Sequence, residues 1–194
     1  METGRKHVSC LMGPKYVFEH SLRVAFWSWR LALEMHADVS RCVAAGLLHD
    51  VSRFESENPD KQDAISAETA RNFMQKEGFK KEFIDAVVYA IENQVRGEQP
   101  RTLETKILHD ANKIDEFGYF RLLIFAKTAA VESFSSLEGN TNSLLAEIMK
   151  LEKGEHGPMW TPTGKSRMQT QIGLYKTFLN GLVEEIENTK TTMQ

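Results

Sequence analysis

Four polar residues stand on, or at the ends of, segments that are otherwise apolar: His20, His49, Asp50 and Asp110. An ionised carboxylate taken out of water needs a cation, hydrogen-bond donors or a raised pKa to offset its lost hydration. Two imidazoles and two carboxylates supply the nitrogen and oxygen ligands that divalent metals accept, and the carboxylate charges cancel the charge of the ion. These residue types therefore predict one site for a divalent metal ion.

A second interpretation of the same residues stays open. In it, His20 and His49 are core histidines that hydrogen-bond to backbone carbonyls, and Asp50 caps the turn that follows it. The four residues considered together favour the metal site, because each of four independent polar burials would otherwise need its own explanation.

The elements that must position these residues are predicted to be helices. Apolar spacing predicts a long helix over 14–35 that carries His20 on its apolar face. Ser40 is expected to cap a second helix that ends at His49 and Asp50, before an irregular segment over 51–59. Thr102 is expected to cap a later helix with Asp110 inside its apolar stripe. Other helices are predicted over 65–75, 81–92, 122–133, 144–152 and 166–187, and the absence of convincing strand alternation predicts an all-α fold.

Composition limits the classes of protein that the chain can represent. Its 194 residues, 41% of them hydrophobic, suffice for one core, or for a compact domain with a helical appendage. A net charge of −3 argues against a binder of nucleic-acid polymers. The sequence shows no membrane span or signal peptide, and its two cysteines lack the paired spacing of a zinc site. We therefore expect a cytoplasmic protein with a small-molecule partner and no membrane partner, and the sequence is compatible with a homodimer.

The motifs also resemble those of a known family, the HD superfamily of metal-dependent phosphohydrolases, whose pattern is H, then HD, then D. The resemblance covers about residues 16–128 and rests on the segments YVFEHSLRVA, AAGLLHDVSRF and KILHDANKIDEFG. A weaker similarity, in WTPTGKSR, is to one bacterial subgroup of uncharacterised HD hydrolases. The resemblance implies an HD-domain helical bundle with additional C-terminal helices, and it implies that His20, His49, Asp50 and Asp110 are the metal ligands.

The expected organisation follows from these segments. Residues 1–13 are predicted to form an N-terminal tail, and residues 14–135 the HD-domain helical core with the metal site. Residues 136–194 are predicted to form a C-terminal helical extension packed on that core.

The chain departs from the family pattern at positions that bear on the number of metal ions and on the general base. Relatives with two metals have further histidines where this chain has Gln62 and Gln94, and a neutral amide is a poor substitute for an imidazole ligand. One ion is therefore expected. One-metal relatives have an acidic residue three positions after the HD pair, where this chain has Arg53, so the general base is left open.

The chemistry expected of such a site is phosphoester hydrolysis. A single divalent ion, whether Mn, Fe, Co, Ni, Zn or Mg, polarises a phosphoryl oxygen and lowers the pKa of a bound water. Arg23, Arg53 and Lys113 each follow a predicted ligand by three residues and are the predicted phosphate-binding cations. Each of them could instead be a solvated charge or the partner of a neighbouring carboxylate. Predicted catalytic residues are Asp50, Lys113 and Asp115, of which Asp115 either holds a cation or acts as the base.

Two functions remain in view for this site. The first is a metal-dependent phosphohydrolase, a phosphomonoesterase or phosphodiesterase, that acts on a small phosphorylated metabolite such as a nucleotide. The alternative is a non-catalytic sensor domain that retains the HD site to bind a nucleotide or a metal. Among the remaining polar and aromatic residues, His109 is expected at the surface or behind the ligands, and Trp27 and Trp29 are expected to pack in the core with one of them at its rim.

Overall fold

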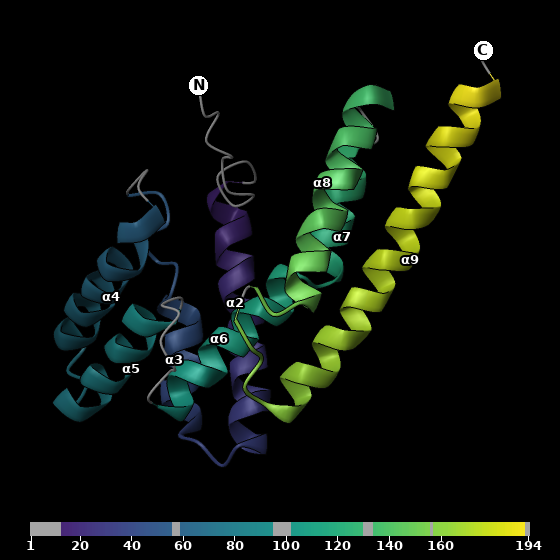
Figure 1. Ribbon diagram of the computed structural model, residues 1–194. Helices are drawn as coiled ribbons and strands as arrows, with labels where there is room; N and C mark the ends of the chain where they lie inside the picture. Colours follow the sequence, from purple (N-terminus) through teal and green to yellow (C-terminus); the bar gives the residue numbers. More distant parts are fainter. Residues whose placement is uncertain (1–12, 56–58, 95–101, 130–133, 156, 193–194) are drawn as a thin grey trace. The chain divides into compact units, whose positions relative to one another are not determined.

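The structure is a computed structural model that describes residues 13–55, 59–94, 102–129, 134–155 and 157–192. Every regular element within these ranges is an α-helix, which confirms the all-α prediction (Figure 1). The predicted N-terminal tail lies outside the described residues except for Gly13. The helices are α2 (Pro14–Glu34), α3 (Val39–Leu48), α4 (Pro59–Lys76), α5 (Lys81–Asn93), α6 (Leu103–Glu116), α7 (Tyr119–Ala129), α8 (Phe134–Glu152) and α9 (Pro162–Thr192).

The chain divides into two compact units, of which the first ends at Lys113 and the second begins at Ile114. This boundary falls inside α6, earlier in the chain than the predicted division after residue 135. The reason is that Phe117 at the end of α6, with Leu122 and Phe125 of α7, packs against side chains of α8 and α9. The packing of a C-terminal extension on the core stays a prediction.

In the first unit, α2 and α3 run antiparallel and in close contact. Helix α2 begins at Pro14, whose fixed φ suits the first turn, and it ends before His36, which has a positive φ of 53°. The prediction that Ser40 caps α3 is wrong, because the cap is Asp38, whose Oδ1 accepts a hydrogen bond from the Arg41 amide at 3.0 Å. Asp38 has the extended backbone that a cap requires, whereas Ser40 already lies in the first helical turn.

Helices α4 and α5 form a second antiparallel pair, joined by polar side chains along their length. Arg71 of α4 donates to Asp85 of α5 at 3.3 Å, and the Gln94 amide nitrogen donates to Asp63 at 3.3 Å. Helix α6 then begins as predicted, because Thr102 Oγ1 accepts a hydrogen bond from the Thr105 amide at 3.2 Å. The first unit thus contains all four predicted metal ligands.

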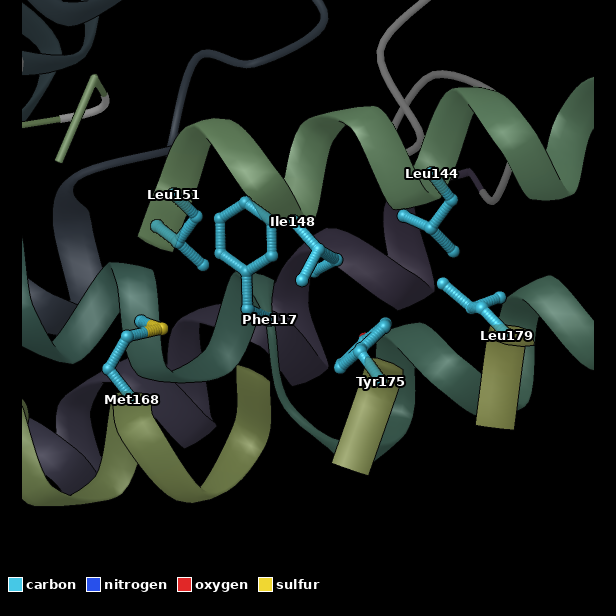
Figure 2. Close-up of a cluster of buried hydrophobic side chains, with 7 residues drawn as sticks. All are labelled: Phe117, Leu144, Ile148, Leu151, Met168, Tyr175 and Leu179. Carbon is cyan, nitrogen blue, oxygen red and sulfur yellow. The ribbon is translucent and has the colours of Figure 1, made fainter. Parts of the chain in front are cut away.

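The second unit is built on a core between α8 and α9. Figure 2 shows Phe117 among side chains that come from these two helices, namely Leu144, Ile148, Leu151, Met168, Tyr175 and Leu179. The Tyr175 hydroxyl donates to the Gly118 carbonyl at 3.0 Å, so the buried phenol is satisfied. Helix α8 begins ten residues earlier than predicted. Its first half is rich in small polar residues, and Thr141 satisfies its hydroxyl on the Leu137 carbonyl of the same helix at 2.7 Å.

Hydropathy along the helices bears on membrane insertion. Within the described ranges, none of the helices combines the length and the apolar character that crossing a bilayer would need.

Candidate metal centre

Three of the predicted ligands meet at the junction of α2 and the end of α3. The Nε2 atoms of His20 and His49 are 3.2 Å apart, and Asp50 Oδ2 is 3.8 Å from each of them. All three residues are buried, and their ligand atoms lie within 4.8 Å of one another. Residues from two helices and the following turn therefore present two nitrogens and one oxygen toward a common point.

The size of this triangle fits a divalent metal ion. The point in its plane that is equidistant from the three atoms lies about 2.1 Å from each, and zinc bonds to imidazole and carboxylate are about 2.0–2.2 Å long. Mixed imidazole and carboxylate ligands also suit manganese, iron, cobalt and nickel. The three residues could hold such an ion with the distances between their ligand atoms unchanged.

Gly46 allows the two helices to come this close. A Cβ atom on Gly46 would lie 2.8 Å from Cα and 2.9 Å from N of Ala25, distances that real Cβ atoms do not adopt. Gly46 precedes His49 by three residues, which is about one helical turn, so the contact at Gly46 sets the distance of His49 from His20. Our sequence reasoning missed this residue, although a lone glycine inside an apolar helix signals a packing requirement.

Gly46 also orients the His49 ring. His49 Nδ1 donates to the Gly46 carbonyl oxygen at 2.9 Å, because a carbonyl can only accept. The proton therefore sits on Nδ1, and the Nε2 lone pair points at the site, as metal-binding histidines require. Burial lowers the pKa of His49, and the charges of His20 and Arg53 act in the same direction, while the charge of Asp50 and the hydrogen bond to Gly46 oppose them. The ring is thus held neutral, the protonation state that binds metals.

This bond is part of the competing interpretation as well, since a core histidine would also bond to a backbone carbonyl. That interpretation also gives the second ring nitrogen a partner, because His49 Nε2 accepts a hydrogen bond from His20 Nε2 at 3.2 Å when no ion is bound. Measurement of bound metal is therefore what separates the two interpretations.

The two oxygens of Asp50 have different partners. Oδ2 faces the imidazoles, and Oδ1 is 3.5 Å from Arg53 Nη1. The turn that carries both residues is held to α4 because the Ser52 amide donates to Ser66 Oγ at 3.3 Å and Ser52 Oγ hydrogen-bonds to Thr69 at 2.7 Å. These hydroxyls, which our sequence reasoning also missed, fix the carboxylate against the histidines.

The other predicted site residues lie in several places. Arg23 has its guanidinium carbon 5.7 Å from the centre of the Tyr16 ring, and that ring stacks on His20 with centroids 6.4 Å apart. Asp110 is fully buried on α6 but is not among the three residues whose ligand atoms lie within 4.8 Å of one another, and Lys113 is half-buried on the next turn. Asp115 is buried at the start of the second unit. The roles of these four residues stay predictions.

Gln62 and Gln94, which replace the histidines of two-metal relatives, are both buried. Gln62 donates to the Arg53 carbonyl at 3.5 Å, and the Gln94 carbonyl oxygen of the backbone accepts from His109 Nδ1 at 2.9 Å. His109 therefore links α6 to the end of α5 and is half-buried, not a surface residue. The two glutamines serve as hydrogen-bonding residues of the first unit.

Comparison with known proteins identifies the family of the chain and supports its helical fold. A family model described as HD domain matches residues 17–116, just over half of the chain, and this range includes all four predicted ligands. Among solved structures, the chain resembles the crystal structure of a predicted HD superfamily hydrolase from an uncultured Thermotogales bacterium. The TM-score is 0.59 at 22% sequence identity, and the match covers 86% of this chain and 79% of the other. At this identity the likeness supports the helical fold.

Proposed function

Because the chain belongs to the HD domain family, we propose that it is a metal-dependent phosphohydrolase that acts on a small phosphorylated metabolite such as a nucleotide. The observation that carries the proposal is the triangle formed by His20 Nε2, His49 Nε2 and Asp50 Oδ2, whose dimensions match the bonds of a divalent ion. Asp110, buried on α6 of the same unit, is the proposed fourth ligand.

When bound, the ion would polarise a phosphoryl oxygen and acidify a water molecule. His49, held neutral and in one tautomer, would contribute a ligand without needing to lose a proton first. Arg53 lies beside Asp50, with Nη1 3.5 Å from Asp50 Oδ1, so it holds a cation next to a proposed metal ligand. We propose that it binds a phosphoryl oxygen while it neutralises Asp50, with Arg23 and Lys113 as further cations.

The test begins with protein purified without added ions. Its metal content is measured, and phosphate release is then followed on nucleoside monophosphates, sugar phosphates and a phosphodiester, with Mn, Fe, Co, Ni, Zn and Mg in turn. We expect Asp50→Asn to lose the ion and to lower the rate by more than about a hundredfold, because a ligand is worth more than the outer residues that orient it. Asp85→Asn is the matched control, since it removes an exposed carboxylate that contacts Lys81 and Arg71 on the surface.

A second function is favoured by a separate observation. The positions of Gln62 and Gln94 offer neutral amides, and Arg53 is engaged with Asp50 in place of an acidic residue. A sensor domain would need residues that bind the ion or the nucleotide, but it would not need residues that catalyse hydrolysis. Stoichiometric metal with saturable nucleotide binding, and no turnover under any of the six metals, would establish the sensor and reject the hydrolase.

A further inference from the structure

The outer face of α2 carries a continuous stripe of exposed apolar side chains. We call this the α2 stripe, and it consists of Phe18, Leu22, Phe26, Trp29 and Leu33. Steps of four, four, three and four residues place all five on one side of the helix. Their exposed fractions lie between 43% and 64%, whereas His20 lies on the other, buried side of α2. The stripe therefore belongs to a surface apart from the metal centre.

The area of the α2 stripe matches that of the largest apolar patch on a typical monomer, a patch that is often functional. A buried aromatic side chain covers about 150–250 Å², so five half-exposed large side chains leave roughly 500 Å² of apolar surface on one helix. A typical monomer exposes a largest patch of about 300–600 Å², and such patches are often binding surfaces. Two copies of the stripe would together bury about 1,000 Å², which is the lower limit for a specific protein interface.

The order of residues in the stripe makes it complementary to itself when reversed. In an antiparallel pair of α2 helices centred near Phe26, Phe18 faces Leu33 of the second copy and Leu22 faces Trp29 of the second copy. Phe26 then lies at the two-fold axis, next to its own counterpart. A two-fold axis requires this self-complementarity.

Charges beside the α2 stripe select the same arrangement. Glu19 follows Phe18 and Arg30 follows Trp29, so both charged side chains lie on the same flank of the stripe, and both are exposed. In the antiparallel pair, Glu19 and Arg30 of the second copy are offset by about 3 Å along the helix axis. Both side chains are long enough to span this offset. A parallel pair would instead put this flank of the two copies on opposite sides of the interface, so Glu19 would not face Arg30 of the second copy. Glu19 is 3.9 Å from Lys15 of its own helix, an exposed contact that contributes little.

We propose that the protein is a two-fold symmetric homodimer in which the α2 stripes of two copies pack against each other antiparallel. The occupant of the stripe is a second copy of the chain, and the proposal does not depend on the activity of the metal centre. Trp29, exposed at 43%, is then an interface residue.

The first experiment measures the mass of the full chain in solution by sedimentation or light scattering. We expect a dimer at micromolar concentrations, and we expect Phe26→Arg to be a monomer, because it places two cations at the two-fold axis. Circular dichroism and metal content of Phe26→Arg should equal those of the wild type, since Phe26 is exposed and contacts no ligand atom. A monomeric wild type, or a dimer that Phe26→Arg leaves intact, would overturn the proposal.

The second experiment distinguishes this pairing from any other interface. Glu19→Arg and Arg30→Glu should each weaken the dimer by about tenfold or more, because each makes like charges face each other twice. The double variant should regain the wild-type dissociation constant. An equimolar mixture of the two single variants should form a heterodimer, because each chain then meets opposite charges at both positions. Failure of both rescues, with the single variants weakened, would overturn the antiparallel arrangement.

Discussion

Replacement of Gly46 by alanine tests how the two histidines are brought together. The added Cβ would meet backbone atoms of Ala25 at 2.8 and 2.9 Å and Ser28 Oγ at 3.0 Å. Ordinary carbon contacts begin near 3.4 Å, so α3 must move away from α2 by about 0.6 Å. Overpacking of this kind costs about 1–3 kcal/mol, and alanine returns about 0.5–1 kcal/mol through its better helix propensity. We expect Gly46→Ala to lower the free energy of unfolding by about 1–2 kcal/mol.

Gly46→Ala should change metal affinity by a larger factor than it changes the stability of the fold. Metal sites tolerate about 0.2 Å in ligand distance, so a shift of α3 that widens the 3.2 Å gap between His20 and His49 should weaken metal affinity by about 10- to 100-fold. Urea denaturation of the metal-free protein measures the first effect, and competition with a chelating dye measures the second. Gly173→Ala is the control, because its Cβ would meet nothing within 4 Å and should stabilise α9 slightly. Wild-type stability and affinity in Gly46→Ala would refute the reasoning.

Three further predictions concern other parts of the molecule. A divalent metal at a hundredfold excess over its Kd should raise the free energy of unfolding of the wild type by about 2.7 kcal/mol, which appears as a higher melting temperature. His20→Ala should show no such rise when the same metal is added. A rise equal to that of the wild type would exclude His20 as a ligand. His36→Gly should stabilise the protein by about 0.5–1 kcal/mol in urea denaturation, because φ is 53° at this residue; a loss would show that its side chain matters more than its backbone. Burial raises the pKa of the Cys42 thiol from 9.0 to about 12, so the unfolded chain loses this proton first and stability falls above pH 9 by at most about 1.4 kcal/mol per pH unit. Cys42→Ala should show a shallower alkaline slope, and an identical slope would contradict the raised pKa.

The helices and the polar residues of the centre could be predicted because they depend on short-range spacing. Steps of three and four residues place His20 on the inner face of α2, and the HD pair ends α3 as expected. The roles of Arg23, Lys113, Asp110 and Asp115 stay predictions. The ends of the helices were harder to predict than their existence. Asp38 and Ser40 are both favourable N-cap residues, and only the backbone conformation set by the preceding turn shows that Asp38 is the cap.

Features that depend on two segments meeting could not be predicted from one sequence. The contact between Gly46 and Ala25 joins residues of different helices, and a local pattern gives no distance between them. The division of the chain inside α6 likewise depends on which core Phe117 enters, and an apolar residue at a helical position is compatible with either. The polar first half of α8 lacked the apolar periodicity on which the helix prediction relied.

The hydrogen bond from His49 Nδ1 to the Gly46 carbonyl has a consequence for proton transfer. A histidine relays protons by exchanging them between its two ring nitrogens, which requires that both nitrogens can gain and lose one. In His49 one nitrogen is committed to a carbonyl and the other to the centre. This imidazole would therefore not shuttle protons, and if the proposed hydrolysis takes place, the proton of the water would have to leave through a different group or directly to bulk solvent.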